Sequence, residues 1–201
     1  MGRTLYRNET RYLGNSASYI EFIFKGTSAS AQVVTLNEVQ ETGMQTCIAV
    51  IIDEGRRGMQ RIALESGEKE IILFKSEKPE TVKIRIQKLS ESKYGIVGVR
   101  LIRTDGAIAP TPELERRIEF VGDSITCGYG VEGTLEGAFT TWEENPLKAY
   151  AVRSADYLLA DYQLVARSGI GIISNWIEPS RHTPDIIDRM PALYEYTDLH
   201  G

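Results

Sequence analysis

Residues 117–124 read Arg-Ile-Glu-Phe-Val-Gly-Asp-Ser, and this stretch decides the fold of the second half of the chain.

 Its first part, Arg117–Val121, is a short apolar run of the kind that forms a buried strand in a parallel sheet. The run leads directly into Gly122-Asp123-Ser124, and open α/β sheets place reactive groups at the C-terminal ends of such strands. We therefore predict an α/β domain that begins near residue 116 and carries its site at the end of this strand.

A helix and a second strand are predicted after this first strand. Asn145-Pro146 indicates a helix start, with Asn as the N-cap and Pro at the first helical position. The next predicted strand is Gln163–Ala166. The apolar face of the helix would consist of Leu147, Tyr150, Ala151, Ala155, Leu158 and Leu159. Two strands and their connections cannot cover both faces of a parallel sheet, so we expect this chain, with one more helix after Thr183, to be one piece of a longer polypeptide.

The first half of the chain has the period of β-strands. From about Ser18 to Arg103 apolar and polar residues alternate, most clearly where Val82, Ile84 and Ile86 point to one side. Short polar or glycine-bearing turns separate the runs, with no helical segment between them. Further strands are predicted at Ala31–Leu36, Cys47–Asp53, Gln60–Leu64, Lys69–Phe74 and Gly95–Ile102. This regular succession predicts an antiparallel, jelly-roll-like β-sandwich.

The stretch Thr104–Pro112 interrupts the strand pattern with two prolines and a glycine, which predicts a linker or a crossover loop. We therefore expect a mixed chain of two domains. A jelly-roll-like sandwich would occupy residues 1–105, a linker 106–116, and the first, incomplete part of an α/β domain 117–201.

Composition sets outer limits on function. Among the 201 residues, 42% are hydrophobic and 25% charged, as in ordinary soluble globular proteins. A net charge of −5 without a dense Lys/Arg cluster argues against nucleic acid and anionic membranes as partners. No run approaches 18 apolar residues, so we expect no membrane span. Cys47 and Cys127 lack metal-ligand spacing, which indicates neither a zinc site nor a disulfide framework.

The N-terminus, Met-Gly-Arg-Thr-Leu-Tyr-Arg-Asn-Glu-Thr, lacks the apolar core of a signal peptide. A cytoplasmic protein is the simplest expectation. The alternative is a secreted protein from which the signal has been removed.

Ser124 is the residue in this chain best placed to act as a nucleophile. A serine hydroxyl must be exposed at a strand end and must lose its proton to a neighbouring base. Gly122 leaves the approach to the serine open, and the Ser124 N–H could donate to an oxyanion. The alternative is a simple turn in which Asp123 or Ser124 caps the segment that follows.

A second glycine-rich strand end favours the chemical interpretation. Residues 165–171 read Val-Ala-Arg-Ser-Gly-Ile-Gly and follow the second predicted strand. The ends of adjacent parallel strands lie side by side. The Gly169 N–H would then lie near the same oxyanion as the Ser124 N–H.

Gly-Asp-Ser-Ile-Thr followed by Ala-Arg-Ser-Gly-Ile-Gly resembles the first two conserved blocks of the SGNH (GDSL) hydrolases. With the jelly-roll-like half in front, the chain resembles carbohydrate esterase family 2. The resemblance implies an SGNH-type α/β hydrolase domain and removal of O-acetyl groups from xylan, mannan or their oligosaccharides. It also implies Ser124 as the nucleophile, Ser124 and Gly169 as oxyanion donors, and no metal or organic cofactor.

The family's other two blocks are missing from this chain. There is no Gly-x-Asn-Asp and no Asp-x-x-His, and the only histidines are His182 and His200. Neither has the family's spacing, and His182 is expected to be an exposed loop residue. We therefore expect the general base to lie outside this chain, in the remaining C-terminal part of the hydrolase domain.

Three aromatic residues lie in predicted loops near the site, namely Tyr129, Trp142 and Trp176. Each could stack on a sugar ring or simply pack against the protein. Cys127 is expected to be a buried small hydrophobe rather than a nucleophile. Two other functions remain open: a carbohydrate-binding protein with a degenerate hydrolase domain, and an SGNH hydrolase of lipids or thioesters.

Overall fold

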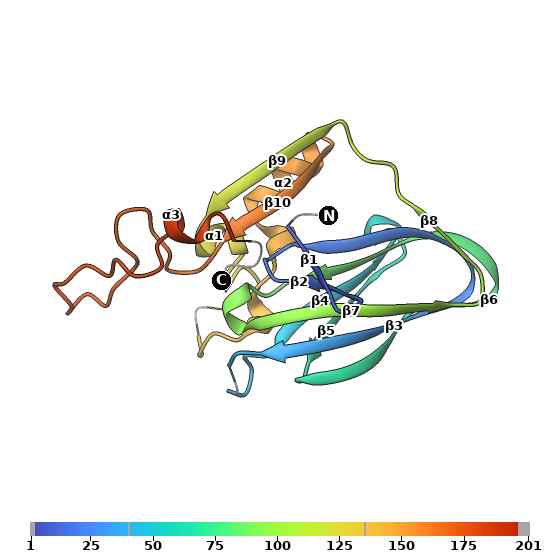
Figure 1. Ribbon diagram of the computed structural model, residues 1–201, viewed down its shortest axis with the longest axis horizontal. Helices are drawn as coiled ribbons and strands as arrows, with labels where there is room; N and C mark the ends of the chain where they lie inside the picture. Colours follow the sequence, from blue (N-terminus) through green and yellow to red (C-terminus); the bar gives the residue numbers. More distant parts are fainter. Residues whose placement is uncertain (1–2, 40, 135, 197–201) are drawn as a thin grey trace.

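The computed structural model describes residues 3–39, 41–134 and 136–196 (Figure 1). Most of its elements are β-strands, and short helices and 3₁₀ turns lie between them. The elements in chain order are β1 (Leu5–Arg7), β2 (Thr10–Leu13), β3 (Tyr19–Asn37), β4 (Thr46–Ile52), η1 (Asp53–Gly55), β5 (Met59–Leu64), β6 (Gly67–Lys88), η2 (Ser92–Tyr94), β7 (Gly95–Thr104), β8 (Ala107–Pro110), β9 (Arg116–Gly122), α1 (Ser124–Cys127), η3 (Thr141–Glu143), η4 (Pro146–Lys148), α2 (Tyr150–Tyr157), β10 (Ala160–Ala166) and α3 (Met190–Leu193).

Strands β1 to β8, which we call the sheet domain, form one antiparallel sheet within the described residues. Seven of them run in the order β1-β2-β7-β3-β6-β4-β5, and β8 pairs with β3. The long strands β3 and β6 pair with each other along most of their length, and both curve through the domain (Figure 1). The fold is therefore a mostly antiparallel β-domain built on one long pair of strands.

Two of the observed strands, β3 and β6, are much longer than the strands predicted within them. Ala31–Leu36 is the second part of β3, and Lys69–Phe74 belongs to β6 together with the run that includes Val82. The β3–β6 register shifts between Gly26 and Ser28 and again between Ala29 and Ser30. A bulge of this kind bends a strand without ending it. The alternation of apolar and polar residues therefore located these strands but did not show that β3 and β6 each continue through a bulge.

The bulge also explains how both parts of β3 face one core. Phe22 and Phe24 are buried before it, whereas Ala29, Ala31 and Val33 are buried after it, so the inward positions change from even to odd numbers. A single step in register moves a strand's side chains to the opposite face, and the bend compensates for it. Phe24 meets Phe74 of β6 edge-on at 5.9 Å between ring centroids, inside the main hydrophobic cluster.

Strands β9 and β10 form a separate two-stranded parallel sheet, joined through α1, a loop and α2. We call residues 116–166 the parallel unit. Asn145 caps η4, as its side chain accepts a hydrogen bond from the Leu147 N–H at 3.1 Å, and α2 follows. The predicted N-cap is thus confirmed, although a 3₁₀ turn precedes the α-helix.

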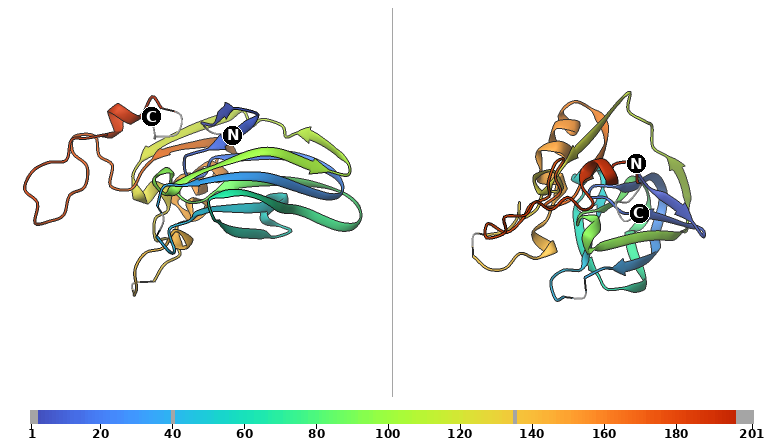
Figure 2. Two further views of the ribbon diagram at one scale, coloured as in Figure 1. Left: turned by 60° about the horizontal axis from the view of Figure 1, so that its bottom comes forward. Right: turned by 60° about the vertical axis from the view of Figure 1, so that its left-hand side comes forward.

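The parallel unit lies against one side of the sheet domain, and the segment after β10 projects away from both (Figure 2). A small apolar cluster joins the two parts. It combines Ala17 and Tyr19 of the sheet domain with residues of α2 and β10, and Tyr19 lies 5.7 Å from Tyr162 between ring centroids. The helix α2 therefore covers one face of β9 and β10, and the sheet domain completes that contact.

Strand β9 is less buried than its sequence predicts. None of its seven residues is fully buried, and Val121 is 47% exposed. Among the described residues β9 pairs with β10 alone, so its other edge has no strand beside it. The expectation of a strand buried on both faces is therefore not met within this chain.

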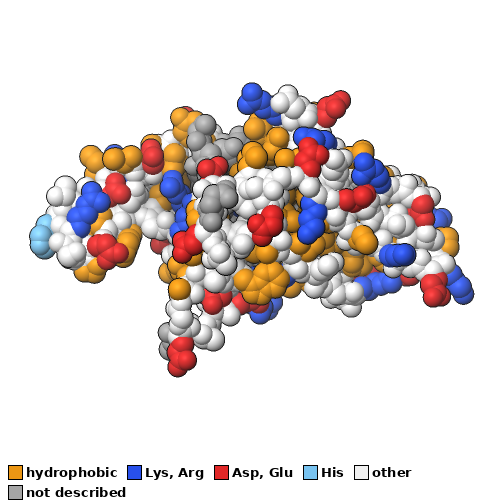
Figure 3. Space-filling view, turned by 90° about the horizontal axis from the view of Figure 1, so that it is seen from below, with side chains coloured by type: hydrophobic (Ala, Val, Ile, Leu, Met, Phe, Trp, Pro, Cys, Tyr) orange, Lys and Arg blue, Asp and Glu red, His pale blue; other side chains and the backbone are white. Residues whose placement is uncertain are grey.

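The expected linker also begins differently. Ala107–Pro110 forms β8, which pairs with Phe22–Lys25 of β3, so part of the interval 106–116 belongs to the sheet. No helix among the described residues is long and apolar enough to cross a membrane. On the face seen in Figure 3, acidic and basic side chains are interspersed rather than gathered by sign.

Candidate active site

Ser124 lies at the first position of α1, immediately after β9. Asp123 is the N-cap of this short helix, and its carboxylate accepts a hydrogen bond from the Ile125 N–H at 3.0 Å. The capping role weighed for Asp123 is therefore real. It leaves Ser124 half-buried at the strand end, with its carbonyl accepting from the Tyr129 N–H at 3.0 Å.

Two glycines shape the backbone around the serine. A Cβ on Gly122 would lie 2.0 Å from the Thr126 hydroxyl, so this glycine is needed for the packing of Thr126 as well as for open access to Ser124. Gly128 ends α1 with a φ of 77°, and a Cβ there would lie 2.5 Å from the Asn145 carbonyl oxygen. A side chain at either position would displace the turn that carries Ser124.

The second glycine-rich loop lies beside the first, as predicted. In the parallel pairing of β9 with β10, Gly122 lies opposite Ala166, so both loops leave the same edge of the sheet. Gly169 has a φ of 81°, and Ile170 N–H donates to the Arg167 carbonyl at 3.1 Å. These features are typical of a type II turn with glycine at its third position. Among the described residues no hydrogen bond involves the Gly169 N–H, which leaves it able to donate.

The three predicted aromatic contacts differ in their surroundings. Tyr129 stacks on Phe139 with 3.7 Å between ring centroids and remains 41% exposed. Trp142 is 47% exposed, and the Arg61 guanidinium lies 4.6 Å from its ring centroid. Trp176 is 66% exposed and joins the second loop through its N–H, which donates to the Gly169 carbonyl at 2.7 Å. All three present ring surface that a ligand could cover.

A buried polar cluster beneath the two loops was missed by the sequence analysis. It consists of Lys88 and Glu91 from the sheet domain and Cys127 and Glu144 from the parallel unit, all fully buried. Lys88 continues the inward-pointing series of Val82, Ile84 and Ile86 in β6. That spacing was the one signal in the sequence that could have placed a charge inside.

Burial controls the protonation of this cluster. Burial lowers the pKa of the Lys88 ammonium to about 8. Burial, together with the neighbouring Glu91 carboxylate, raises the pKa of Glu144 well above its usual range. Burial also raises the pKa of the Cys127 thiol well above its usual value, so Cys127 is the inert buried residue that was predicted.

Ligand atoms of Glu91, Cys127 and Glu144 all lie within 4.8 Å of one another, as in some metal sites. Other groups already interact with them. The Lys88 ammonium contributes positive charge, and the Ser168 N–H donates to the Glu91 carboxylate at 2.6 Å. We therefore assign no metal to these residues.

Within the described residues, His182 makes no hydrogen bond with Ser124. His182 is exposed in the projecting segment after β10, as predicted, and His200 lies outside the described residues. The general base expected from outside this chain stays a prediction.

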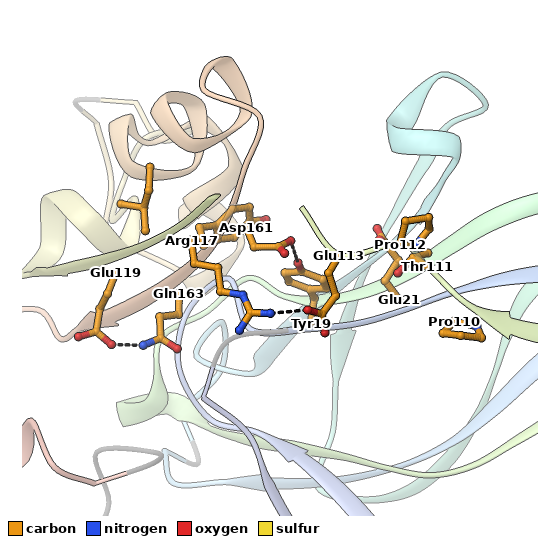
Figure 4. A pocket seen from close by; sticks show the side chains of 12 residues that line it. Tyr19, Glu21, Pro110, Thr111, Pro112, Glu113, Arg117, Glu119, Asp161 and Gln163 are labelled. Atoms are coloured by element: carbon orange, nitrogen blue, oxygen red, sulfur yellow. Dashed lines mark hydrogen bonds and ion pairs between the residues drawn. The ribbon is translucent and has the colours of Figure 1, made fainter. Parts of the chain in front are cut away.

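A cavity of about 540 Å³ lies elsewhere, near the beginnings of β9 and β10 (Figure 4). Tyr19, Arg117 and Asp161 are among its lining residues, and the Tyr19 hydroxyl donates to Asp161 at 3.3 Å. Ser124 follows the opposite end of β9. This cavity is therefore separate from the candidate active site, and no feature of the sequence indicated it.

Comparison with known proteins identifies relatives. The family model described as Carbohydrate esterase 2 N-terminal matches residues 1–112. Cellulase/esterase CelE of Acetivibrio thermocellus is 47% identical over 92 residues, which are 45% of this chain and 11% of that protein. An acetylxylan esterase / glucomannan deacetylase of Cellvibrio japonicus is 29% identical over 203 residues, covering 98% of this chain and 52% of that protein.

A solved structure resembles the whole chain. The family two carbohydrate esterase from Clostridium thermocellum, in complex with cellohexaose, is 28% identical with a TM-score of 0.83. The match covers 100% of this chain and 58% of that one. The chain therefore spans between 11% and 58% of the length of these three relatives.

Proposed function

The chain belongs to carbohydrate esterase family 2, and from this premise we propose that it is the N-terminal part of a serine acetylesterase. The substrate would be an acetylated polysaccharide or oligosaccharide such as xylan or mannan. One observation carries the proposal above all others: the pairing of Gly122 with Ala166, which brings the Ser124 loop and the Gly169 loop to one edge of a parallel sheet.

The proposed reaction uses Ser124 as the nucleophile. Its oxygen would attack the acetyl carbonyl carbon while a base takes the hydroxyl proton, and the sugar alcohol would leave with a proton. Water would then attack the acetyl-serine and release acetate. The Ser124 and Gly169 N–H groups would stabilise the oxyanion in both steps, since Gly169 N–H has no other acceptor among the described residues.

We propose that further residues of a longer polypeptide complete an SGNH-type α/β hydrolase domain and supply the base. The exposed edge of β9 supports this proposal, because strands of parallel sheets are ordinarily covered. Accordingly, residues 1–201 alone are expected to lack esterase activity. His182 cannot substitute unless the projecting segment folds back onto Ser124.

The aromatic side chains suggest how sugar would be held. Tyr129 follows Ser124 by five residues, and its ring is supported from behind by Phe139. Trp176 is bonded to the Gly169 loop through its backbone. We propose Tyr129, Trp142 and Trp176 as sugar contacts, because exposed, pre-positioned rings bind sugar faces well.

Substitution of the nucleophile tests the proposed function. In the full-length protein, Ser124→Ala is expected to remove hydrolysis of 4-nitrophenyl acetate and of acetylated xylan by at least about 10³-fold, with an unchanged melting temperature. Ser180→Ala, in the exposed projecting segment, is the matched control and should keep full activity. More than about a tenth of the activity remaining in Ser124→Ala would refute the assignment.

Binding of carbohydrate without hydrolysis is a second candidate, favoured by the cellohexaose bound to the 28% identical relative. Affinity electrophoresis of the full-length protein in soluble glucan or xylan distinguishes the two candidates. Retardation by the polysaccharide without release of acetate would support the binding protein. Release of acetate that depends on Ser124 would support the esterase.

A further inference from the structure

Glu91 connects the sheet domain to the loop that carries Gly169. It precedes η2, its side chain is fully buried, and its Oε2 accepts a hydrogen bond from the Ser168 N–H at 2.6 Å. Its Oε1 makes no hydrogen bond but lies 3.4 Å from the Lys93 ammonium. A buried side-chain oxygen that accepts a backbone N–H fixes that backbone, because moving the amide away would leave a buried polar group without a partner.

The bonded amide belongs to the turn that presents Gly169. Ser168 is the second residue of the Arg167–Ile170 turn, and Gly169 is the third. The Ile170 N–H and the Gly169 carbonyl are both bonded, to Arg167 and Trp176 respectively. The Ser168 N–H is thus bonded to Glu91, whereas no hydrogen bond among the described residues uses the Gly169 N–H.

We propose that Glu91 is a positioning residue, which orients the Gly169 N–H toward the oxyanion by anchoring the Ser168 amide. This inference rests on the proposed esterase function. It assigns a catalytic purpose to the contact between the sheet domain and the parallel unit, since the residue that aligns the donor comes from the sheet domain.

The surroundings of Glu91 stabilise its carboxylate in this role. Lys93 is its ion-pair partner, and Lys88 is buried in the same cluster. The carboxyl of Glu144 accepts a hydrogen bond from the Glu91 backbone N–H, so Glu144 holds the main chain of Glu91 while Glu91 holds Ser168. Glu91 is thus held through its carboxylate by Lys93 of the sheet domain and through its backbone by Glu144 of the parallel unit.

Two substitutions in the full-length protein separate positioning from charge. Glu91→Gln keeps an oxygen acceptor at the same reach and removes the charge. Glu91→Asp keeps the charge but withdraws it by one methylene, which breaks a bond of 2.6 Å. We expect Glu91→Gln to keep kcat within about threefold and Glu91→Asp to lower kcat about tenfold, a fraction of the ~10²–10³ lost when an oxyanion donor is removed. KM should change less than about threefold in both, because substrate contacts are not altered.

The matched control is Glu21, whose side chain is 10% exposed and pairs with Arg85 Nε at 2.7 Å, away from both loops. Glu21→Asp and Glu21→Gln should leave kcat unchanged. A charge effect at Glu91 would reverse the order, with Asp active and Gln impaired, and would overturn the inference. Equal kcat in wild type, Glu91→Gln and Glu91→Asp would overturn it as well.

Hydrogen–deuterium exchange covers the case in which Glu91→Asp does not fold. In Glu91→Gln the peptide that contains Ser168 should stay as protected as in wild type, with kcat retained. Loss of kcat in Glu91→Gln despite normal protection would contradict the inference. If Ser124→Ala proves fully active, the proposed function fails instead, so the two failures are distinguishable.

Discussion

The sheet domain and the parallel unit differ in how far each one buries its own residues. The sheet domain surrounds a cluster contributed by six of its strands, from Leu13 of β2 to Val99 of β7. The parallel unit has only small clusters, and the one under α2 needs Ala17 and Tyr19 of the sheet domain. The sheet domain is stabilised by contacts among its own residues, whereas the parallel unit depends on contacts with the sheet domain.

This difference also concerns where polar groups are buried. The buried charged side chains among the described residues are Lys88, Glu91 and Glu144, and all three lie at the contact between the two parts. Buried charges contribute little net stability but are costly to leave unpaired. We therefore infer that these buried charged residues align the Ser124 and Gly169 loops rather than stabilise the fold.

The largest expected effect compares one phenylalanine from each part. Phe24 is fully buried in the sheet domain, whereas Phe120 of β9 is only partly buried. We expect Phe24→Ala to lower the free energy of unfolding by about 3–5 kcal/mol, and Phe120→Ala by less than half of that. Urea denaturation followed by circular dichroism measures both. Equal losses would show that the parallel unit has a core of its own.

The sequence predicted the strands and the helix of both parts, but neither the continuity of the long strands nor the contacts between the two parts. Alternation located the strands and Asn145-Pro146 located the helix start, because local patterns determine both. The continuity of β3 and β6 escaped prediction, since a bulge leaves the same pattern as a turn. The adjacency of the Ser124 and Gly169 loops was predictable from parallel pairing. The Glu91 contact with Ser168 joins residues 77 positions apart and had no local signal.

A smaller effect is expected at two glycines of the Ser124 loop. Gly128 and Gly130 both have positive φ angles, of 77° and 65°. A Cβ at Gly128 would meet the Asn145 carbonyl, but nothing lies within 4 Å of one at Gly130. We expect Gly130→Ala to cost about 1 kcal/mol from backbone strain and Gly128→Ala about 3 kcal/mol from strain and overlap together. Similar values in thermal unfolding would mean that the loop is not held against Asn145.

The smallest expected effect concerns the pH dependence of stability at the contact. The pKa of Glu144 is raised in the folded state by burial, so folded Glu144 keeps a proton that the unfolded chain releases. Its stabilising contribution is therefore complete below about pH 4.5 and is lost as the pH rises toward the raised pKa. Glu144→Gln has no proton to lose, and its free energy of unfolding should fall less than that of wild type between pH 5 and 8. Parallel curves in urea denaturation at several pH values would contradict a protonated Glu144.

Covalent labelling of Ser124 tests the central claim most directly. The full-length protein would be incubated with a 4-nitrophenyl phosphonate ester, which transfers its phosphonyl group to an activated serine with release of 4-nitrophenol, and then mapped by peptide mass spectrometry. The account predicts one adduct, on the peptide that contains Ser124, together with loss of esterase activity in proportion to labelling. Inactivation with the adduct on another residue, or acetyl ester hydrolysis that persists after complete labelling of Ser124, would contradict it.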